Sequence, residues 1–378
     1  MQGSLSARSL AKQTSKYVFV DVCKKMLIER LKRDKNSLGS KQESVRMSKF
    51  NALMVRRAED KSVSREIEKI NIDDLPADGD VLIAVKYSTL NYKDGMCLQG
   101  IGGLVREYPH IPGIDFAGEV VESADQRYAP GDKVVLTGWR VGEIWWGGYA
   151  QFARVKADWL VPLVDGMSCF DAMAIGTAGL TAMLSIMSLE KFGLKKDGAE
   201  VLVTGASGGV GSIAVVLLSE MGYRVSAITG KPEQAEYLRS LGATQIIARG
   251  DIMDGEKKPI QSAKWAGCID SVGGDMLARI LTQMKPLSAV TVVGNAGGND
   301  LSLNIIPFML RGIGMIGVDS ASCAFDIRIK AWKRLARDLP KPALESASSV
   351  IGLADVSAAG KDILAGRVRG RVVVDVNR

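Results

Sequence analysis

The chain has 378 residues, of which 47% are hydrophobic and 24% charged. This length is enough for about two domains with cores of their own, at roughly 100 to 200 residues per domain. The net charge of +7 comes entirely from residues 1–46, which hold 11 Lys and Arg against 4 Asp and Glu. The neutral remainder argues against nucleic acid as the main partner, because such a partner requires a basic face on the folded domain.

Residues 1–46 are rich in Ser, Lys and Arg, and we expect them to form a basic, disordered extension before a fold that begins near Met47. The first 16 residues contain no acid and also fit an organelle-targeting peptide, whereas Asp21, Glu29 and Asp34 depart from that pattern. An upstream start codon that is not the one used is a third interpretation. We expect a cytoplasmic protein, with an organelle as the alternative if the extension is a targeting peptide.

The first half of the fold, up to about residue 164, shows short β-type runs separated by Gly, Pro and Asp. The pattern predicts strands at 51–55, 81–87, 117–121, 133–136 and 149–155. Residues 172–189 then carry no charge over a length that can span a membrane. Their Gly, Ser and Thr content favours a buried helix between two domains, and we expect no membrane association.

The second half alternates strand and helix patterns, which predicts a parallel, doubly wound sheet. The expected strands are 201–204, 224–229, 245–247, 267–270, 289–293 and 315–318, with a helix at about 211–222 after the first of them. A helix at 325–339 and a strand at 371–376 complete the chain.

The most specific motif is the glycine-rich turn in the segment 201–212, VLVTGASGGVGS, with glycines at 205, 208, 209 and 211. A strand, this turn and a helix start receive a dinucleotide pyrophosphate, because the bare backbone permits close approach and the free helix N–H groups meet its charge. The next strand ends in Thr229, Gly230 and Lys231, without the carboxylate that holds an NAD ribose. NADPH is therefore favoured over NADH, the alternative being that Lys231 is a solvated charge at a helix start.

The cysteines and the single histidine give no sign of a metal site. Cys23, Cys97, Cys169, Cys268 and Cys323 are scattered without a Cys-x-x-Cys motif, and we expect them to be reduced and mostly buried. His110 is the only imidazole. A zinc-dependent dehydrogenase combines imidazole and thiolate ligands, so we expect none here.

Several segments together resemble the medium-chain dehydrogenase/reductase superfamily and, within it, the zinc-free acrylyl-CoA reductase family of AcuI or YhdH type, often labelled quinone oxidoreductase. The resemblance runs from Met47 to Asn377. The segments that carry it are Ser88–Asp94 (STLNYKD), Ile111–Gly118 (IPGIDFAG), Leu136–Trp139 (LTGW), Trp146–Ala150 (WGGYA), Val155–Leu160 (VKADWL), Ala172–Gly179 (AMAIGTAG), Gly317–Ser320 (GVDS) and Gly370–Arg371.

The resemblance implies a GroES-like catalytic domain of residues 47–174 and 320–378, with a Rossmann domain of residues 175–319 between its two parts. It also implies a cleft between these domains. Where zinc-dependent relatives carry ligands, this chain has Asn91–Asp94 and Gly113–Asp115. Both places lack zinc ligands, in agreement with the histidine count.

Reduction of an α,β-unsaturated thioester requires hydride at the β-carbon, a proton at the α-carbon and donors for the charge that develops on the thioester oxygen. By resemblance the donors are Asn91, Tyr92 and Lys93, with Asp94 orienting them. We expect Tyr92 to line the nicotinamide and to donate its hydroxyl. The alternative is that Tyr92 only packs and that solvent supplies the proton. Asp115 is expected to satisfy loop amides.

The resemblance also assigns cofactor contacts: Ser207, Gly208, Gly209 and Val210 for the pyrophosphate, Thr229, Gly230 and Lys231 for the 2′-phosphate, and further Arg249, Asn295, Met309, Ser320 and Arg369. Asn295 stands where this family has an apolar residue, and Arg249 and Arg369 also fit ordinary surface charges. For the phosphates of a coenzyme A substrate the candidates are Arg106, Arg140, Arg328 and Arg334. Trp139, Trp145 and Trp146 either cap the substrate or pack within the protein.

The sequence thus predicts an NADPH-dependent reductase of short α,β-unsaturated acyl-CoA thioesters, most simply acrylyl-CoA to propionyl-CoA. NADPH:quinone reduction is the rival activity, and a non-catalytic NADPH-binding protein is the rival from another class. The intact segment Asn91–Asp94 argues against the latter, because binding alone does not require it. A homodimer through edge strands of the nucleotide domain is expected by resemblance.

Overall fold

A computed structural model describes residues 49–254 and 258–378. The strands and α-helices below belong to one compact unit, Phe50–Ile70 with Leu75–Arg378. Lys49 and Asn71–Asp74 belong to a second unit, which includes the 3₁₀ helix η1 (Ile72–Asp74). The predicted extension, the targeting alternative and Cys23 lie outside the described residues.

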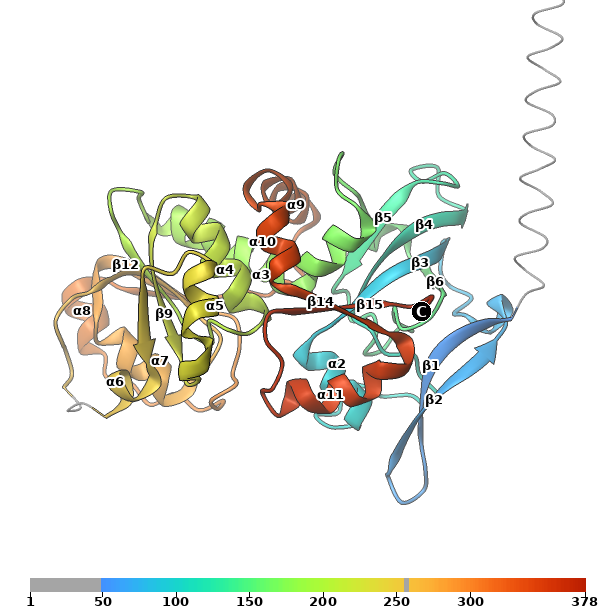
Figure 1. Cartoon of the computed structure of the whole chain (residues 1–378), viewed down its shortest axis with the longest axis horizontal. Coiled ribbons are helices and arrows are strands. Elements are labelled where there is room, and N and C mark those ends of the chain that lie inside the picture. The colour runs from blue at the N-terminus through green and yellow to red at the C-terminus, as the bar shows by residue number, and fades with distance from the viewer. Residues whose placement is uncertain (1–48, 255–257) are drawn as a thin grey trace, which may run out of the picture. The chain divides into compact units, whose positions relative to one another are not determined.

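The second half of the chain forms a six-stranded parallel sheet in the order β10-β9-β8-β11-β12-β13. Counted in chain order this is the 3-2-1-4-5-6 arrangement of a dinucleotide-binding fold. The predicted doubly wound sheet is confirmed. Strands β9 and β12 of this sheet are labelled in Figure 1. The strands are β8 (Glu200–Val203), β9 (Arg224–Thr229), β10 (Gln245–Ala248), β11 (Trp265–Asp270), β12 (Met284–Val292) and β13 (Gly314–Gly317).

Helices cover both faces of this sheet because its strand residues alternate between two cores. Val201 and Val203 pack with helix α4, whereas Leu202 between them packs with α7. The helices of this half and of the tail are α4 (Gly209–Glu220), α5 (Ala235–Ser240), α6 (Arg249–Met253), α7 (Gly274–Leu281), α8 (Ile306–Arg311), α9 (Phe325–Asp338), α10 (Lys341–Ser346) and α11 (Val356–Leu364), with the 3₁₀ helices η3 (Pro232–Gln234) and η4 (Leu353–Asp355).

The first half of the chain and its last strands form a seven-stranded sheet in the order β14-β15-β3-β4-β5-β7, with β6 paired to β3. The C-terminal strand β15 (Arg371–Asp375) therefore pairs with a strand almost 300 residues earlier, and its residue Val372 lies opposite Leu90. The other elements are β3 (Val81–Leu90), α2 (Tyr92–Gln99), β4 (Asp115–Ser123), β5 (Lys133–Thr137), β6 (Phe152–Val155), η2 (Ala157–Trp159), β7 (Val161–Pro162) and β14 (Ser348–Gly352).

Strands β1 (Phe50–Arg57) and β2 (Val63–Ile70) form a separate antiparallel hairpin. The sequence predicted neither β2, nor β7, nor β14. In β2 the sequence VSREIEKI is half charged and half of its residues are exposed, so its alternation lacks an apolar face. β7 has two residues, and β14 is an edge strand with mostly solvent-accessible side chains, so neither offers a clear pattern.

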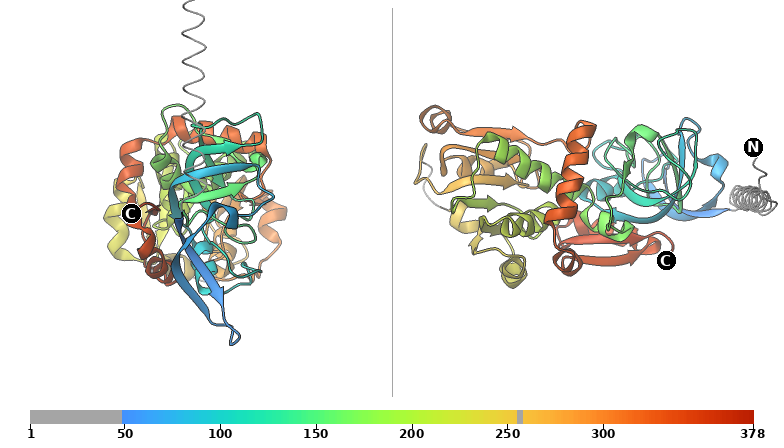
Figure 2. Two further views of the ribbon diagram at one scale, coloured as in Figure 1. Left: turned by 90° about the vertical axis from the view of Figure 1, so that its right-hand side faces the viewer. Right: turned by 90° about the horizontal axis from the view of Figure 1, so that it is seen from above.

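The uncharged stretch is helix α3 (Cys169–Phe192), which is long and apolar enough to cross a membrane by length and composition alone. In the structure 83% of its most apolar window is buried, and it contacts both β4 and β12, which agrees with the predicted buried helix. α9 packs beside it (Figure 2). The helix is interrupted at Gly176, whose φ of 51° and ψ of −161° are not helical. The predicted domain boundary between residues 174 and 175 stays a prediction.

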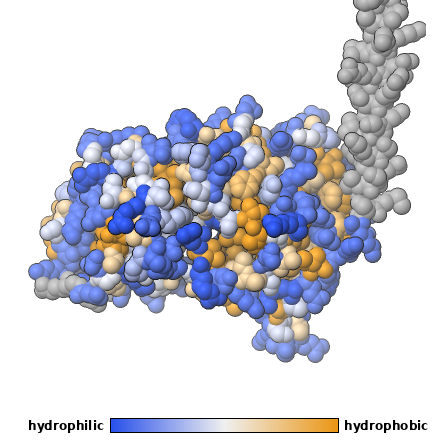
Figure 3. Space-filling view, in the orientation of Figure 1, coloured by the Kyte–Doolittle hydropathy of each residue, from blue (hydrophilic) through white to orange (hydrophobic). Residues whose placement is uncertain are grey.

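On the face shown in Figure 3 hydrophilic side chains predominate, and hydrophobic ones form small groups between them. The described cysteines are free thiols; Cys97, Cys169 and Cys268 are buried, and Cys323 is partly buried. Apolar groups are thus concentrated in the cores on either side of the parallel sheet and around α3.

Candidate functional site

The segment Asn91–Asp94 marks the change from strand β3 to helix α2. Asn91 has extended backbone angles and caps the helix, which begins at Tyr92. Asp94 in the first turn accepts hydrogen bonds from the backbone N–H of Asn91 at 2.8 Å and from its Nδ2 at 3.2 Å. This contact helps to fix where the helix starts, because the Asp94 carboxylate satisfies the backbone N–H of the residue that precedes the helix.

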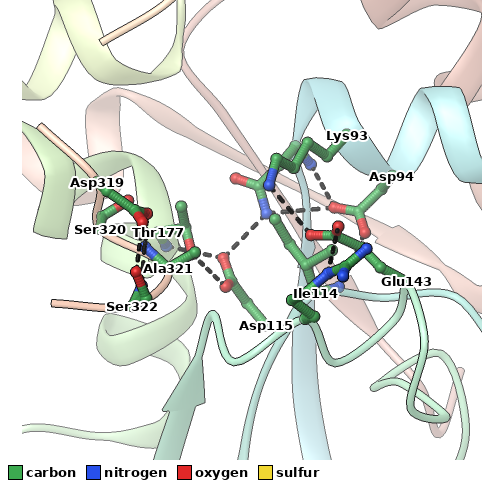
Figure 4. A network of polar contacts seen from close by, with 12 residues as sticks. Lys93, Asp94, Ile114, Asp115, Glu143, Thr177, Asp319, Ser320, Ala321 and Ser322 are labelled. Carbon is green, nitrogen blue, oxygen red and sulfur yellow. Dashed lines mark hydrogen bonds and ion pairs between the residues drawn. The ribbon is translucent and has the colours of Figure 1, made fainter. Parts of the chain in front are cut away.

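Asp94 is fully buried and holds a neighbouring loop in place as well. Its Oδ1 accepts the backbone N–H of Ile114 at 2.8 Å (Figure 4). Burial, together with the charge of Asp115, raises the pKa of Asp94 to about 7. Asp94 therefore orients the backbone around Asn91. The sequence analysis predicted instead that Asp94 orients the side chains of Asn91, Tyr92 and Lys93.

Asp115 at the start of β4 is the second buried carboxylate. It accepts from the backbone N–H of Thr177 at 2.7 Å, from the Thr177 hydroxyl at 2.5 Å and from Asn91 Nδ2 at 2.9 Å (Figure 4). Burial raises its pKa, against the effect of these hydrogen bonds. Asp115 thus accepts a backbone N–H from helix α3, directly after the interruption at Gly176, where a loop amide had been expected, and Asn91 links it to Asp94.

These contacts leave Asn91 without a free donor, because both carboxylates accept from its side-chain amide. Its role in the structure is thus to connect two buried acids, in contrast to the expected role as a donor to substrate. Tyr92, the next residue, is different: its side chain is 49% exposed. Within this segment, Tyr92 and Lys93 are the residues open to a ligand.

Lys93 is held by a residue that sequence reasoning missed. Its Nζ donates to Glu143 Oε1 at 3.0 Å, and Arg140 Nε lies 3.7 Å from the other oxygen of the same carboxylate. The Glu143 side chain is 6% exposed, whereas that of Lys93 is 47% exposed. Glu143 is a single glutamate in a Gly- and Trp-rich loop, 50 residues from Lys93. No sequence motif links the two residues, so their contact could be found only in the folded structure.

The glycine-rich turn joins β8 to α4 and leaves no room for a side chain at Gly211. Gly205 has a φ of 56°, and a Cβ at Gly211 would lie 2.4 Å from the Gly205 carbonyl oxygen. Gly208 caps α4, and no side chain accepts from the first N–H groups of this helix among the described residues. Beside the turn lies the buried Ser271 Oγ, which has no hydrogen-bond partner among the described residues. A bare, positive helix start next to an unpaired hydroxyl fits a dinucleotide pyrophosphate.

The ends of β9 and β10 bring the predicted 2′-phosphate residues together. The Thr229 hydroxyl accepts the backbone N–H of Lys231 at 3.0 Å, and Lys231 Nζ donates to the carbonyl of Gly366. A Cβ at Gly230 would lie 3.7 Å from Arg249 Cδ, so the Arg249 side chain, which is exposed, lies over this turn. Two cations thus flank the end of β9.

The segment before β15 lies against the glycine-rich turn between β8 and α4. The backbone N–H of Gly370 donates to the Ser207 carbonyl at 3.0 Å. The Arg369 guanidinium stacks on the Tyr237 ring at 4.7 Å, and the Tyr237 hydroxyl bonds to Ser212 Oγ at 3.0 Å. The structure therefore brings Arg369 close to the glycine-rich turn; its contact with the cofactor stays a prediction.

The remaining predicted cofactor residues are more dispersed. Ser320 Oγ accepts from Thr181 Oγ1 at 2.7 Å, next to Thr177, and so lies near Asp115 (Figure 4). Asn295 is exposed in the loop after β12 and bonds to Asn299. Met309 is exposed on α8. Of these three, Ser320 is the one that hydrogen bonds tie to the Asn91 region.

The structure corrects two of the arginines expected to meet coenzyme A phosphates. Arg328 is fully buried and donates to the carbonyls of Thr137 and Ser320, so it joins β5 to the loop before α9. Arg334 pairs with Glu190 at 2.5 Å. Arg106 is exposed and Arg140 partly exposed, so these two stay candidates.

The tryptophans do not act as a set. Trp145 Nε1 donates to the Arg154 carbonyl at 2.8 Å and its ring packs edge-on against Trp159, so it belongs to the packing of the β-rich part. Trp139 lies under the Arg328 guanidinium at 5.1 Å. Trp146 is partly exposed in the same loop as Glu143.

The single histidine is a core residue. His110 is 2% exposed, and burial lowers its pKa to about 4, so the ring is neutral. Among residues 49–254 and 258–378, no group of three or more His, Cys, Asp or Glu side chains is placed to hold a metal ion.

Comparisons with known proteins agree with this architecture. Residues 77–165 match the alcohol dehydrogenase GroES-like domain, and residues 209–337 match the zinc-binding dehydrogenase family. The crystal structure of the yhdH oxidoreductase from Salmonella enterica in complex with NADP has a TM-score of 0.84 and 44% identity, covering 86% of this chain and 99% of that one. The predicted GroES-like and Rossmann fold class is confirmed.

Two curated relatives match almost over their full length. Acrylyl-CoA reductase AcuI of Ruegeria pomeroyi is 56% identical, over 87% of this chain and 99% of the relative. YhfP of Bacillus subtilis, which carries a quinone oxidoreductase name, is 45% identical over 86% and 98%. A YhfP crystal structure with NAD bound has a TM-score of 0.84 and 44% identity, covering 87% of this chain and 100% of that one. This chain belongs to the acrylyl-CoA reductase family of AcuI and YhdH type within the medium-chain dehydrogenase/reductase superfamily.

Proposed function

We propose that this protein reduces the C=C bond of a short α,β-unsaturated acyl-CoA with NADPH, and that its substrate is acrylyl-CoA. The observation that carries the proposal is the 56% identity to an acrylyl-CoA reductase over 99% of that relative. In this reaction a hydride and a proton are added across the double bond, giving propionyl-CoA and NADP⁺. NADPH bound at the glycine-rich turn supplies the hydride.

The residues that hold the cofactor are proposed from their positions around the turn. Ser207, Gly208, Gly209 and Val210 present backbone groups at the start of α4, where the helix dipole favours a pyrophosphate. For the 2′-phosphate we assign Thr229, Gly230, Lys231, Arg249 and Arg369, whose hydroxyl, backbone and cations gather at the ends of β9 and β10 and on the tail.

Tyr92 is the proposed catalytic donor. Hydride addition at the β-carbon leaves negative charge on the thioester oxygen, and a hydrogen bond aimed at that oxygen lowers the barrier. Tyr92 is exposed at the start of α2, directly after the buried cap formed by Asn91 and Asp94. These two residues position the helix start, and the buried Glu143 holds Lys93 beside it as a second donor.

Reduction of quinones is the second candidate function, favoured by the 45% identity to YhfP. The test is NADPH oxidation by the purified full chain, measured in parallel with acrylyl-CoA and with a simple benzoquinone. A much higher kcat/KM for acrylyl-CoA, with KM between about 1 μM and 1 mM, supports the thioester reductase. Turnover of benzoquinone alone would replace this function with quinone reduction. Tight NADPH binding without any turnover would leave the non-catalytic alternative.

We further propose a homodimer that forms along β13. This strand is the edge of the parallel sheet, and an edge exposes unpaired backbone groups to a second chain. Apolar side chains are exposed on β13 itself, on the adjacent β12, and on and just before α8, which contacts β12: Met315, Leu287, Ile305, Met309 and Leu310. An apolar surface beside an open strand edge is typical of an interface between copies of one chain.

The predicted two-domain division and metal-free mechanism also remain part of the proposal. The interruption of α3 at Gly176, one residue beyond the predicted boundary, supports a division there. We propose a cytoplasmic location, supported by the burial of the one long apolar helix among the described residues.

A further inference from the structure

A buried arginine contacts the catalytic segment and the glycine-rich turn from a third part of the chain. Arg371, the first residue of β15, is 2% exposed. Its Nε donates to the Ala174 carbonyl at 3.0 Å, its Nη2 to the Thr89 hydroxyl at 2.8 Å and its Nη1 to Asn91 Oδ1 at 3.3 Å. One guanidinium thus joins β15, β3, α3 and the cap of α2.

The contact with Asn91 determines how that carboxamide is oriented. Because Oδ1 accepts from the Arg371 cation, Nδ2 is turned toward Asp94 and Asp115 and donates to both. The reverse orientation would place the amide N–H groups against a cation and the carbonyl oxygen against two carboxylates. Arg371 therefore favours the arrangement in which the Asn91 amide links Asp94 to Asp115, directly before Tyr92.

The guanidinium also packs directly against two glycines. A Cβ at Gly176, where α3 is interrupted, would lie 2.7 Å from Nη2, and a Cβ at Gly209 would lie 2.9 Å from Nη1. Gly209 is the first residue of α4, and Gly370, the residue before Arg371, donates its backbone N–H to the Ser207 carbonyl in the turn. The arginine thus lies against the start of the helix that receives the pyrophosphate.

The charges explain why an arginine serves here. Asp94 and Asp115 are fully buried, and the positive charge of Arg371 favours the ionised form of Asp115, lowering its pKa against the effect of burial. Removal of a buried cation that acts on a buried acid is costly, because it leaves the charge of that acid uncompensated. Only a guanidinium reaches three acceptors in fixed directions at once.

We propose that Arg371 is a positioning residue that fixes the Asn91 carboxamide and couples it to the glycine-rich turn, so that Tyr92 is aligned with the bound cofactor. The kinetic part of this inference rests on the proposed reductase function. The affinity for NADPH, measured in the absence of substrate, does not depend on that function and gives an independent readout.

The experiment compares Arg371→Met and Arg371→Lys with Arg311→Met in the full chain. Arg311 is a matched control, since its guanidinium also donates to backbone carbonyls, those of Thr282 and Met284, away from the Asn91 region. Measured are the Tm, the Kd for NADPH by fluorescence, and kcat and KM for acrylyl-CoA.

For Arg371→Met we expect kcat to fall about 10- to 100-fold and the NADPH Kd to rise severalfold, while KM for acrylyl-CoA changes little, because misalignment of reacting groups acts on the chemical step. Arg371→Lys should recover part of kcat. Arg311→Met should lower only the Tm.

A kcat and an NADPH Kd for Arg371→Met close to those of Arg311→Met would overturn the inference and leave Arg371 a packing residue. If the methionine variant does not fold, an unchanged kcat and Kd in Arg371→Lys has the same consequence. If the wild type does not reduce acrylyl-CoA, the proposed function fails, and the same variants are compared by NADPH Kd and by benzoquinone turnover.

Discussion

At the scale of single residues, the structure separates Tyr92 from its neighbours, since it is exposed where Asn91 and Asp94 are buried. We predict that Tyr92→Phe lowers kcat for acrylyl-CoA about 100-fold or more, as for loss of one oxyanion donor, with NADPH affinity nearly unchanged. Steady-state kinetics and NADPH titration measure both values.

The control for Tyr92 is Tyr128→Phe, which removes another hydroxyl, bonded to the Leu160 carbonyl at 2.7 Å. It should cost about 1 kcal/mol of stability without changing kcat. A Tyr92→Phe enzyme as active as Tyr128→Phe would mean that Tyr92 only packs and that another group or solvent serves the thioester.

Asp94 gives a prediction with a defined sign. Burial and the charge of Asp115 raise its pKa from 3.8 to about 7, so the native state binds this proton more tightly than the unfolded chain. Its contribution to the free energy of unfolding is complete below about pH 4 and is lost as the pH rises through about 7. In urea unfolding at several pH values, the stability difference between wild type and Asp94→Asn should shrink over this window.

The comparison for Asp94 is Asp338→Asn. The hydrogen bond from Arg337 lowers the pKa of Asp338, so its contribution is present above its unfolded pKa and is lost as the pH falls. As the pH rises, the stability difference between wild type and variant should therefore shrink for Asp94→Asn and grow for Asp338→Asn. A difference for Asp94→Asn that does not vary with pH would contradict the raised pKa.

At the scale of elements, the glycine-rich turn depends on the absence of side chains. A Cβ at Gly211 would lie 2.4 Å from the Gly205 carbonyl oxygen, so we expect Gly211→Ala to displace the start of α4, with a loss of about 1–3 kcal/mol in stability. NADPH affinity should fall with it. At Gly317 a Cβ meets nothing within 4 Å, so Gly317→Ala should retain both. Equal NADPH affinity in the two variants would show that the turn does not hold the cofactor.

At the scale of the whole molecule, the exposed apolar surface around β13 predicts the oligomeric state. Sedimentation equilibrium of the wild type should give twice the chain mass. Leu310 is 71% exposed on α8, and Leu310→Asp should shift the protein to monomer, because a charge buried in an apolar interface is costly. Ile67, exposed on β2, is the control: Ile67→Asp should remain dimeric. A wild-type monomer would refute the interface.

The amino-acid sequence alone determined the parallel sheet, the glycine-rich turn and the family, because these depend on local signals: strand and helix periodicity, glycines at fixed spacing and contiguous motifs such as Asn91–Asp94. It did not reveal β2 or β14, whose residues alternate without an apolar face. Only the tertiary structure decided that Glu143 holds Lys93, that Arg328 is buried and that Arg371 contacts Asn91. Lys93 and Glu143 lie 50 residues apart, and Asn91 and Arg371 lie 280 residues apart. A single polar residue is not part of a periodic pattern, so the sequence does not indicate which residue it contacts.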